Sequence, residues 1–195
     1  MKHLSILILF ILFFSSCGEN QNETTKDEAI FLEELTKKEK EFEPIIASLK
    51  NKKPISIKEL DIWAPNNIAE MNRSLYTPNS SPETFVFTAK ADYKKGGKSI
   101  SLSLLDGAGG KGSLVISPFL TLESIYNENS NNDGYQKLIL KNGKTFFQKY
   151  TKSNDVYVLQ FVINNRFVIK IESQSLSEEE LWMAIDEFQF ENLPN

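Results

Sequence analysis

A length of 195 residues suits one folded domain, or one domain with an appendage, and a hydrophobic fraction of 41% is enough for a real core. With 22 basic against 26 acidic residues, the formal net charge is -4. The broad basic surface of a nucleic-acid-binding protein is therefore missing, and we expect no nucleic-acid partner.

The first sixteen residues are typical of a signal peptide. Lys2 and His3 give a positive start, and Ser5 is the one polar residue in the stretch 4–14. Eleven residues are too few for a stable transmembrane helix, which needs about 20 apolar residues. The small residues Ser15 and Ser16 then lead to a cysteine, Cys17, where a cleavage site belongs.

This arrangement resembles the lipobox of bacterial lipoproteins. The resemblance implies that Cys17 is diacylated on its sulfur, becomes the new N-terminus and then carries a further acyl chain, such as palmitate, on its amine. Phe14 departs from the family pattern, which prefers Leu there, and an ordinary secretory signal with a chance cysteine is the alternative. Gly18 follows the cysteine where enteric lipoproteins retained at the inner membrane have Asp, which implies the outer membrane and leaves its periplasmic or surface face open.

We therefore divide the chain into a signal peptide at 1–16, a lipidated cysteine with a polar spacer at 17–25 and a single domain at 26–195. Loss of the signal removes Lys2 from the 22 basic residues and leaves 21 against 26 acidic residues, a balance of -5. Residues 18–25 include no apolar side chain, so this stretch cannot offset its ordering entropy by burial.

Three capping patterns predict helices. Thr25 with Glu28 predicts an amphipathic N-terminal helix that begins near Lys26 and ends near residues 50–53, with a kink or a break at Pro44. Ser56 with Glu59 predicts a short helix or turn, and Ser177 with Glu180 predicts a last helix with its apolar face on the sheet.

Alternation of apolar and polar residues predicts about six strands, joined largely as antiparallel hairpins. The turns at Asn142-Gly143 and Asn164-Asn165 tolerate positive φ. The strand at 156–163 is apolar on both faces, so we expect it to be central and covered on both sides. The strands are expected at residues 84–93, 99–104, 135–141, 144–151, 156–163 and 166–172, with a further possible edge strand at 71–76.

The sequence thus predicts an α+β fold: a kinked N-terminal helix, a predominantly antiparallel sheet of about six strands and a C-terminal helix packed on the sheet. The order of elements is similar to that of cystatin-like and PsbP-like folds, without any residue motif of either.

The processed chain has no histidine, because His3 lies in the signal peptide, and its one cysteine is assigned to lipid. Triads that use histidine, cysteine–histidine pairs and histidine-ligated zinc sites are therefore excluded. Carboxylate pairs and Ser-Lys sites remain open but have no supporting spacing. We expect no cofactor and no metal site, since Asn129–Asp133 lacks the key ligands of a calcium loop and is interpreted as a flexible polar loop.

The segment from Asp106 to Ser113 is rich in glycine and follows a strand. It fails the Walker A pattern, because Gly110-Lys111 is followed by Gly112 and Leu105 occupies the first glycine position. The favoured interpretation is a long turn that is dispensable for folding. The functional alternative is a mobile loop whose backbone at Gly109, Gly110 and Gly112, with Lys111, contacts an anion.

Four aromatic residues could form an exposed binding platform: Trp63, Trp182, Phe146 and Phe147. Core packing is favoured for them, because Trp182 lies in a helix that packs on the sheet and one of the two adjacent phenylalanines must point inward. Only the outward-pointing phenylalanine stays unexplained.

The function most consistent with these observations is a membrane-anchored lipoprotein with a non-enzymatic domain that binds a protein or another envelope component. One alternative is a hydrolase with a carboxylate or Ser-Lys site. A second alternative is a small-ligand carrier whose pocket lies between sheet and helix. The sequence does not identify the partner.

Overall fold

The computed structural model of the protein describes residues 33, 36–37, 40–60, 63–78, 86–121, 128–188 and 190–194. The strands and labelled helices all lie in one compact unit, Lys37–Asn195. The expected signal peptide, Cys17, the spacer and the Thr25–Glu28 capping pattern lie outside the described residues.

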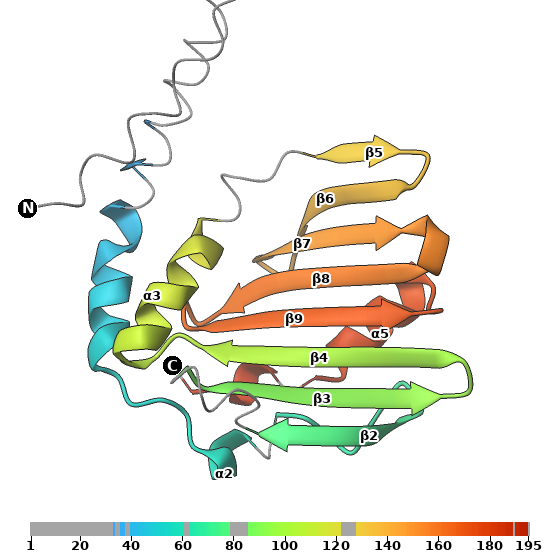
Figure 1. The fold of residues 1–195 in the computed structure, drawn as a ribbon, viewed down its shortest axis with the longest axis horizontal. Helices are drawn as coiled ribbons and strands as arrows, with labels where there is room; N and C mark the ends of the chain where they lie inside the picture. Colours follow the sequence, from blue (N-terminus) through green and yellow to red (C-terminus); the bar gives the residue numbers. More distant parts are fainter. Residues whose placement is uncertain are drawn as a thin grey trace, which may run out of the picture. The chain divides into compact units, whose positions relative to one another are not determined.

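The described strands form one open, antiparallel sheet of nine strands in the order β1-β2-β3-β4-β9-β8-β7-β6-β5 (Figure 1). The two short strands, β1 and β5, lie at the edges, and β9 lies in the middle. The strands are β1 (Asn67–Ile68), β2 (Met71–Pro78), β3 (Thr88–Lys95), β4 (Lys98–Asp106), β5 (Asn129–Asn131), β6 (Gly134–Lys141), β7 (Lys144–Thr151), β8 (Val156–Ile163) and β9 (Phe167–Gln174).

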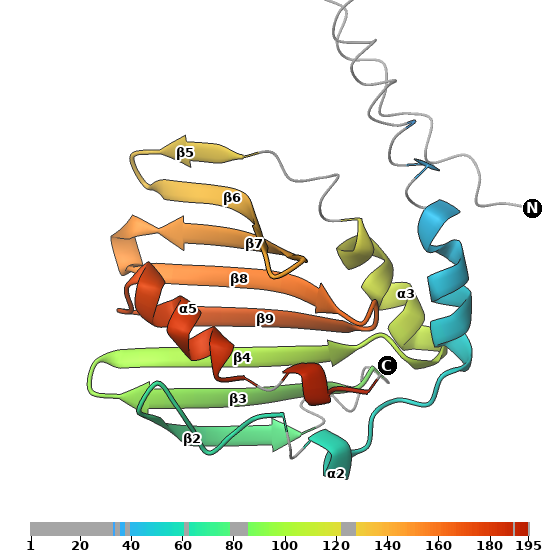
Figure 2. The ribbon, with the colours of Figure 1, turned by 180° about the vertical axis from the view of Figure 1, so that it is seen from behind.

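Helices cover the two faces of this sheet unequally. The helix α5 (Glu178–Asp186) lies behind the sheet in Figure 1 and in front of it in Figure 2. The other face is covered at one end by α3 (Gly109–Leu120) and by a helix at residues 40–51, whose apolar side chains pack on Val168 of β9. The remaining short elements are α2 (Ile57–Leu60), η2 (Lys152–Asn154) and η3 (Phe190–Asn192). Among the described residues, the helices are all too short or too polar to cross a membrane.

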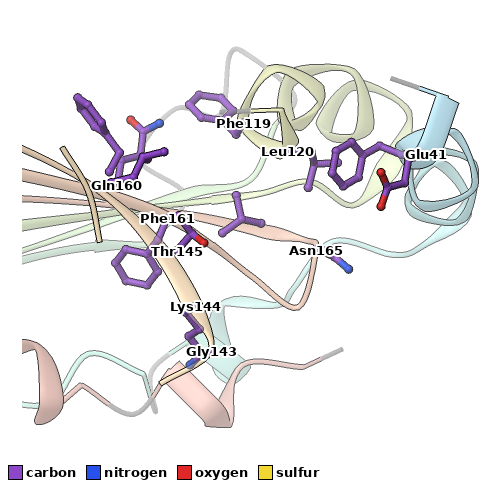
Figure 3. A pocket seen from close by; sticks show the side chains of 13 residues that line it. Glu41, Phe119, Leu120, Gly143, Lys144, Thr145, Gln160, Phe161 and Asn165 are labelled. Carbon is purple, nitrogen blue, oxygen red and sulfur yellow. The ribbon is translucent and has the colours of Figure 1, made fainter. Parts of the chain in front are cut away.

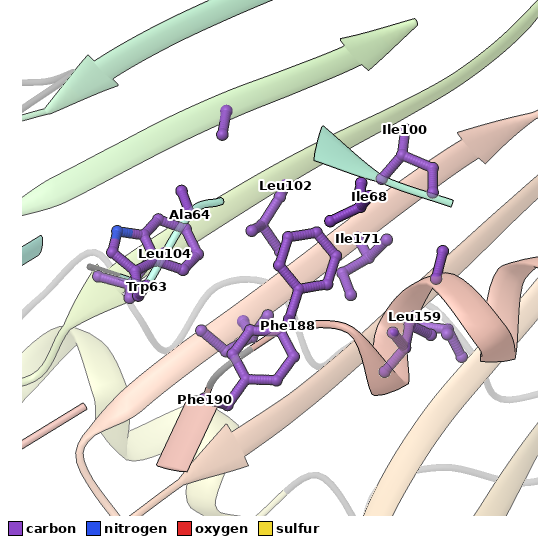
Figure 4. Packing of buried hydrophobic residues seen from close by; sticks show 14 of the residues in the cluster. Trp63, Ala64, Ile68, Ile100, Leu102, Leu104, Leu159, Ile171, Phe188 and Phe190 are labelled. Atoms are coloured by element: carbon purple, nitrogen blue, oxygen red, sulfur yellow. The ribbon is translucent and has the colours of Figure 1, made fainter. Parts of the chain in front are cut away.

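The main core lies between the sheet and α5. Apolar side chains from β4, β9 and β8, such as Leu102, Ile171 and Leu159, meet Phe188 and Phe190 from the C-terminal end (Figure 4). Trp63 is 1% exposed in the same cluster. Burial of these apolar side chains is the dominant favourable contribution to the free energy of folding.

The predicted fold class, with about six strands, was wrong, because the described sheet has nine. Strands β1 and β5 have two and three residues, so neither is long enough to show an alternating pattern. Asn129–Asn131, interpreted as part of a flexible loop, is β5 and pairs with β6. The possible edge strand near Met71 is β2, and β1 flanks it as the edge.

The predicted kinked N-terminal helix was also wrong. The helical residues 40–51 run through Pro44 without a break, and the expected start near Lys26 lies outside the described residues. Proline removes one helical hydrogen bond. Phe42 before it, and Ile45 and Leu49 after it, all pack in the same apolar cluster with α3, which favours one continuous helix over two short ones.

The prediction that β8 is central and covered on both faces holds only in part. It is an interior strand, and Leu159, Phe161 and Ile163 are buried on the α5 side. Val156 and Val158 are only half-buried, because α3 reaches just one end of the opposite face.

The capping and turn predictions for the C-terminal half were confirmed. Ser177 and Glu180 form a reciprocal capping box at the start of α5. Asn142 and Asn164 have φ values of 53° and 54° in the turns that join β6 to β7 and β8 to β9. Ser56 and Glu59 also bond to each other at the start of α2.

Candidate functional site

The glycine-rich segment is not a loop, so the sequence interpretation of Asp106–Ser113 was wrong. Gly109, Gly110, Lys111 and Gly112 form the first turn of α3. The N-cap residue of this helix is Ala108, which has no capping side chain. The Asp106 carboxylate accepts a hydrogen bond from the Ala108 N–H at 2.9 Å.

Two of the glycines are required by close packing. A Cβ atom on Gly107 would lie 2.8 Å from the carbonyl oxygen of Arg166, and one on Gly112 would lie 2.8 Å from the carbonyl oxygen of Asp106. Both distances are shorter than an ordinary contact. Glycine here allows α3 to approach the sheet.

A buried ion pair holds this junction together. Both Asp106 oxygens accept hydrogen bonds from the guanidinium of Arg166, at 2.8 and 2.9 Å, and the Ile55 N–H donates to the same carboxylate at 2.7 Å. The Asp106 side chain is 0% and the Arg166 side chain 5% exposed. The pair therefore joins the end of β4, the turn between β8 and β9 and the segment before α2, which is a structural role.

A second polar cluster lies where α5 begins. Glu178 accepts hydrogen bonds from the hydroxyl of Tyr135 at 2.9 Å, the amide of Gln148 at 2.9 Å and the ammonium of Lys137 at 3.2 Å. Burial alone would raise the pKa of Glu178, but these donors outweigh it and hold the pKa below its usual value. Burial, and then the hydrogen bond to Glu178, raise the pKa of Tyr135.

This cluster combines a carboxylate, a lysine and a tyrosine, and it is therefore the arrangement to weigh against the hydrolase alternative. Its Glu178 oxygens are engaged by three donors from β6 and β7, so the cluster ties α5 to these strands. Among the described residues, no group of three or more His, Cys, Asp or Glu side chains is placed to hold a metal ion.

The candidate site is a pocket of about 360 Å³ on the sheet face that α3 and the 40–51 helix cover in part (Figure 3). Its floor comes from β6, β7 and β8, and its far walls come from the two helices. The apolar lining comprises Phe42, Phe119, Leu120, Leu138, Phe147 and Val162, with the backbone side of Phe161. The ring of Phe161 itself packs into the opposite core against Phe146.

Strand register explains this floor. Leu138, Phe147 and Gln160 pair across β6, β7 and β8 and therefore point to one face in one row. Thr145 of β7 follows two residues before Phe147 and points to the same face. The pocket thus has an apolar floor that contains one amide and one hydroxyl.

The polar lining residues are Glu41, Lys144, Thr145, Gln160 and Asn165. In the part of the chain described, their side chains make no hydrogen bond or ion pair with the protein. Thr145 and Gln160 are half-buried, whereas Glu41, Lys144 and Asn165 are exposed. Figure 3 shows Glu41 and Lys144 on different sides of the pocket. A cavity that combines apolar side chains with a few free polar groups is typical of small-molecule sites.

The sequence analysis identified one of these residues indirectly. Phe146 is 5% exposed in the main core, and Trp182 packs edge-on against it with ring centroids 5.0 Å apart, as expected. Phe147 is the phenylalanine that points the other way, and it lines the pocket. The glycines 109, 110 and 112 and Lys111 do not line it, and their predicted anion contact stays a prediction.

Neither a scan against models of known protein families nor searches of curated proteins and of solved structures found a match for this chain.

Proposed function

We propose that this protein is a lipoprotein of the bacterial cell envelope, anchored in the outer membrane through Cys17, and that its folded unit is a non-enzymatic binding module. The lipobox resemblance supports the anchor, and the absence of histidine after residue 3 supports binding rather than hydrolysis. The unit binds an apolar group of an envelope component in the pocket between α3 and the sheet.

One observation carries this proposal: a cavity of about 360 Å³, lined by both apolar and polar side chains, whose polar side chains have no partner in the described protein. Well-packed interiors leave few voids larger than a water molecule. A cavity of this size, open to solvent and lined by three phenylalanines, is therefore a place where a ligand would bury apolar surface.

The test fills the pocket. Val162 of β8 lines it, so Val162→Phe should place a ring in the cavity and abolish binding of an environment-sensitive naphthalene dye, measured by fluorescence titration. Val158→Phe is the matched control, because Val158 lies on the same strand and face outside the pocket. Equal dye binding by both variants and the wild-type protein, or no dye binding by any of them, would contradict the proposed site.

A further inference from the structure

The pocket's lining also indicates which class of molecule it takes, an inference that rests on the proposed function. We propose that the pocket binds a single acyl chain along its apolar walls and recognises the carbonyl at the head of that chain, in an ester or amide, through the side-chain amide of Gln160.

The pocket as a whole is small. Its volume of about 360 Å³ is near the lower end of the range of about 300–1,000 Å³ for small-molecule pockets. Phe119 and Leu120 of α3 and Leu138 and Phe147 of the sheet all line it. Such a wall offers contact along the length of a hydrocarbon.

Two half-buried polar side chains interrupt that wall, the hydroxyl of Thr145 on β7 and the amide of Gln160 on β8. The proposal rests on Gln160. It pairs with Phe147 on β7, which in turn pairs with Leu138 on β6, so its amide stands in line with two apolar side chains. The Gln160 side chain projects from the sheet on the side where Phe119 lies (Figure 3). In the described structure this half-buried amide donates to no protein acceptor.

A plain hydrocarbon in this pocket would cover the amide of Gln160 and leave it without water or any other partner, which costs free energy. A ligand with a carbonyl oxygen at the same depth accepts the N–H group and removes that cost. Lys144 and Glu41 are exposed at the mouth, so the charged head of an amphiphile stays solvated there and is selected less strongly than the carbonyl.

The experiment compares two photoreactive probes of equal chain length, a diazirine-bearing alkyl methyl ester and the matching alkyl methyl ether. The full-length protein is presented with nanodiscs of an ether-linked phosphatidylcholine, whose chains have no carbonyl. Mass spectrometry then measures labelling of the pocket residues relative to labelling of Leu140, an exposed leucine on β6 that does not line the pocket.

We expect about fivefold more pocket labelling by the ester than by the ether, the ratio that one hydrogen bond provides. Gln160→Leu should bring the ratio to one while both probes still label the pocket. Gln174→Leu is the matched control, because Gln174 lies on the same sheet face outside the pocket, and it should keep the preference.

Equal labelling by both probes in the wild-type protein, or an ester preference that survives Gln160→Leu, would overturn this inference and leave the binding module intact. Labelling of the pocket by neither probe would overturn the proposed function together with the inference. A parallel series with ester-linked nanodiscs identifies the source of the chain. If the chain comes from bilayer lipid, these nanodiscs compete with the ester probe and lower its labelling of the pocket. If it comes from free acyl compounds, labelling by the ester probe is the same in both kinds of nanodisc.

Discussion

The buried pair of Asp106 and Arg166 is the residue-scale interaction on which the junction of α3 and the sheet depends. Arg166→Met should lower the free energy of unfolding by about 3–5 kcal/mol, because it leaves the Asp106 carboxylate buried without its cationic partner. Urea denaturation measures this loss. Arg73→Met is the control, since Arg73 is only part-buried and bonds to Ala64 and Asn66. An equal loss in the two variants would show that the pair has no special role.

Two glycines of the same junction should respond in opposite ways to a single methyl group. Gly107→Ala places a Cβ atom 2.8 Å from the Arg166 carbonyl and should cost about 1–3 kcal/mol. Gly110→Ala meets nothing within 4 Å in α3 and should raise stability by up to about 1 kcal/mol. Thermal unfolding of both variants tests this contrast. If Gly107→Ala left the stability unchanged, the interpretation of this segment as dispensable for folding would stand.

The Glu178 cluster gives a pH dependence whose sign follows from its lowered pKa. A carboxyl group whose pKa is lower in the folded state stabilises the protein above its unfolded pKa of about 4.3, and this contribution is lost as the pH falls through the folded value. Glu178→Gln should therefore destabilise the protein at pH 7 and do so less at pH 3. Denaturation at both pH values measures the difference. Glu179→Gln, on the exposed side of the same turn, should show no such change.

At the scale of elements, the turn between β1 and β2 is unlike the other two-residue turns. Ala69 and Glu70 both have positive φ, 44° and 61°, which costs about 1–2 kcal/mol for a residue with a Cβ atom. Ala69→Asn should raise the free energy of unfolding by up to about 1 kcal/mol, because asparagine tolerates this conformation. The reverse change, Asn142→Ala, should lower it by a similar amount. Urea midpoints that moved in the same direction for both would contradict this explanation.

These turns also show what the sequence could predict. Asn142-Gly143 and Asn164-Asn165 contain residues that favour positive φ, so their hairpins were predictable. The turn at Ala69-Glu70 has no such signal, and β1, with two residues, is too short to show an alternating pattern. Asp106–Ser113 has the composition of a loop, but Gly107 packs against the distant backbone of Arg166 and the segment begins a helix. Tertiary contact decided that segment against local propensity.

The pocket illustrates the same limit. Its lining comes from the 40–51 helix, α3, β6, β7 and β8, which tertiary packing brings together across more than 100 positions of the chain. Alternation alone required that one of Phe146 and Phe147 face away from the main core. The register of β7 with β6 and β8 shows that this residue is Phe147 and that Gln160 lies beside it.

At the scale of the whole molecule, the two apolar clusters share their strands. Ile169 and Ile171 of β9 point into the main core, while Val168 of the same strand packs with α3 and the 40–51 helix. Disruption of either cluster would therefore also disturb the strand that the other cluster packs on. The pocket is therefore built on strands that the main core fixes, and all its lining residues lie within Lys37–Asn195.

That separation makes the proposed anchor testable by itself. Cys17→Ser should move the protein from the membrane fraction to the soluble fraction, because acyl chains that bury about 0.8 kcal/mol per methylene group would no longer be attached. Sedimentation after a high-salt wash measures the change, and Ser16→Ala, which keeps the cysteine, should stay with the membrane. The released variant should keep its dye affinity, since the pocket lies wholly within Lys37–Asn195. Continued sedimentation of Cys17→Ser at high salt would show that another part of the protein holds it at the membrane.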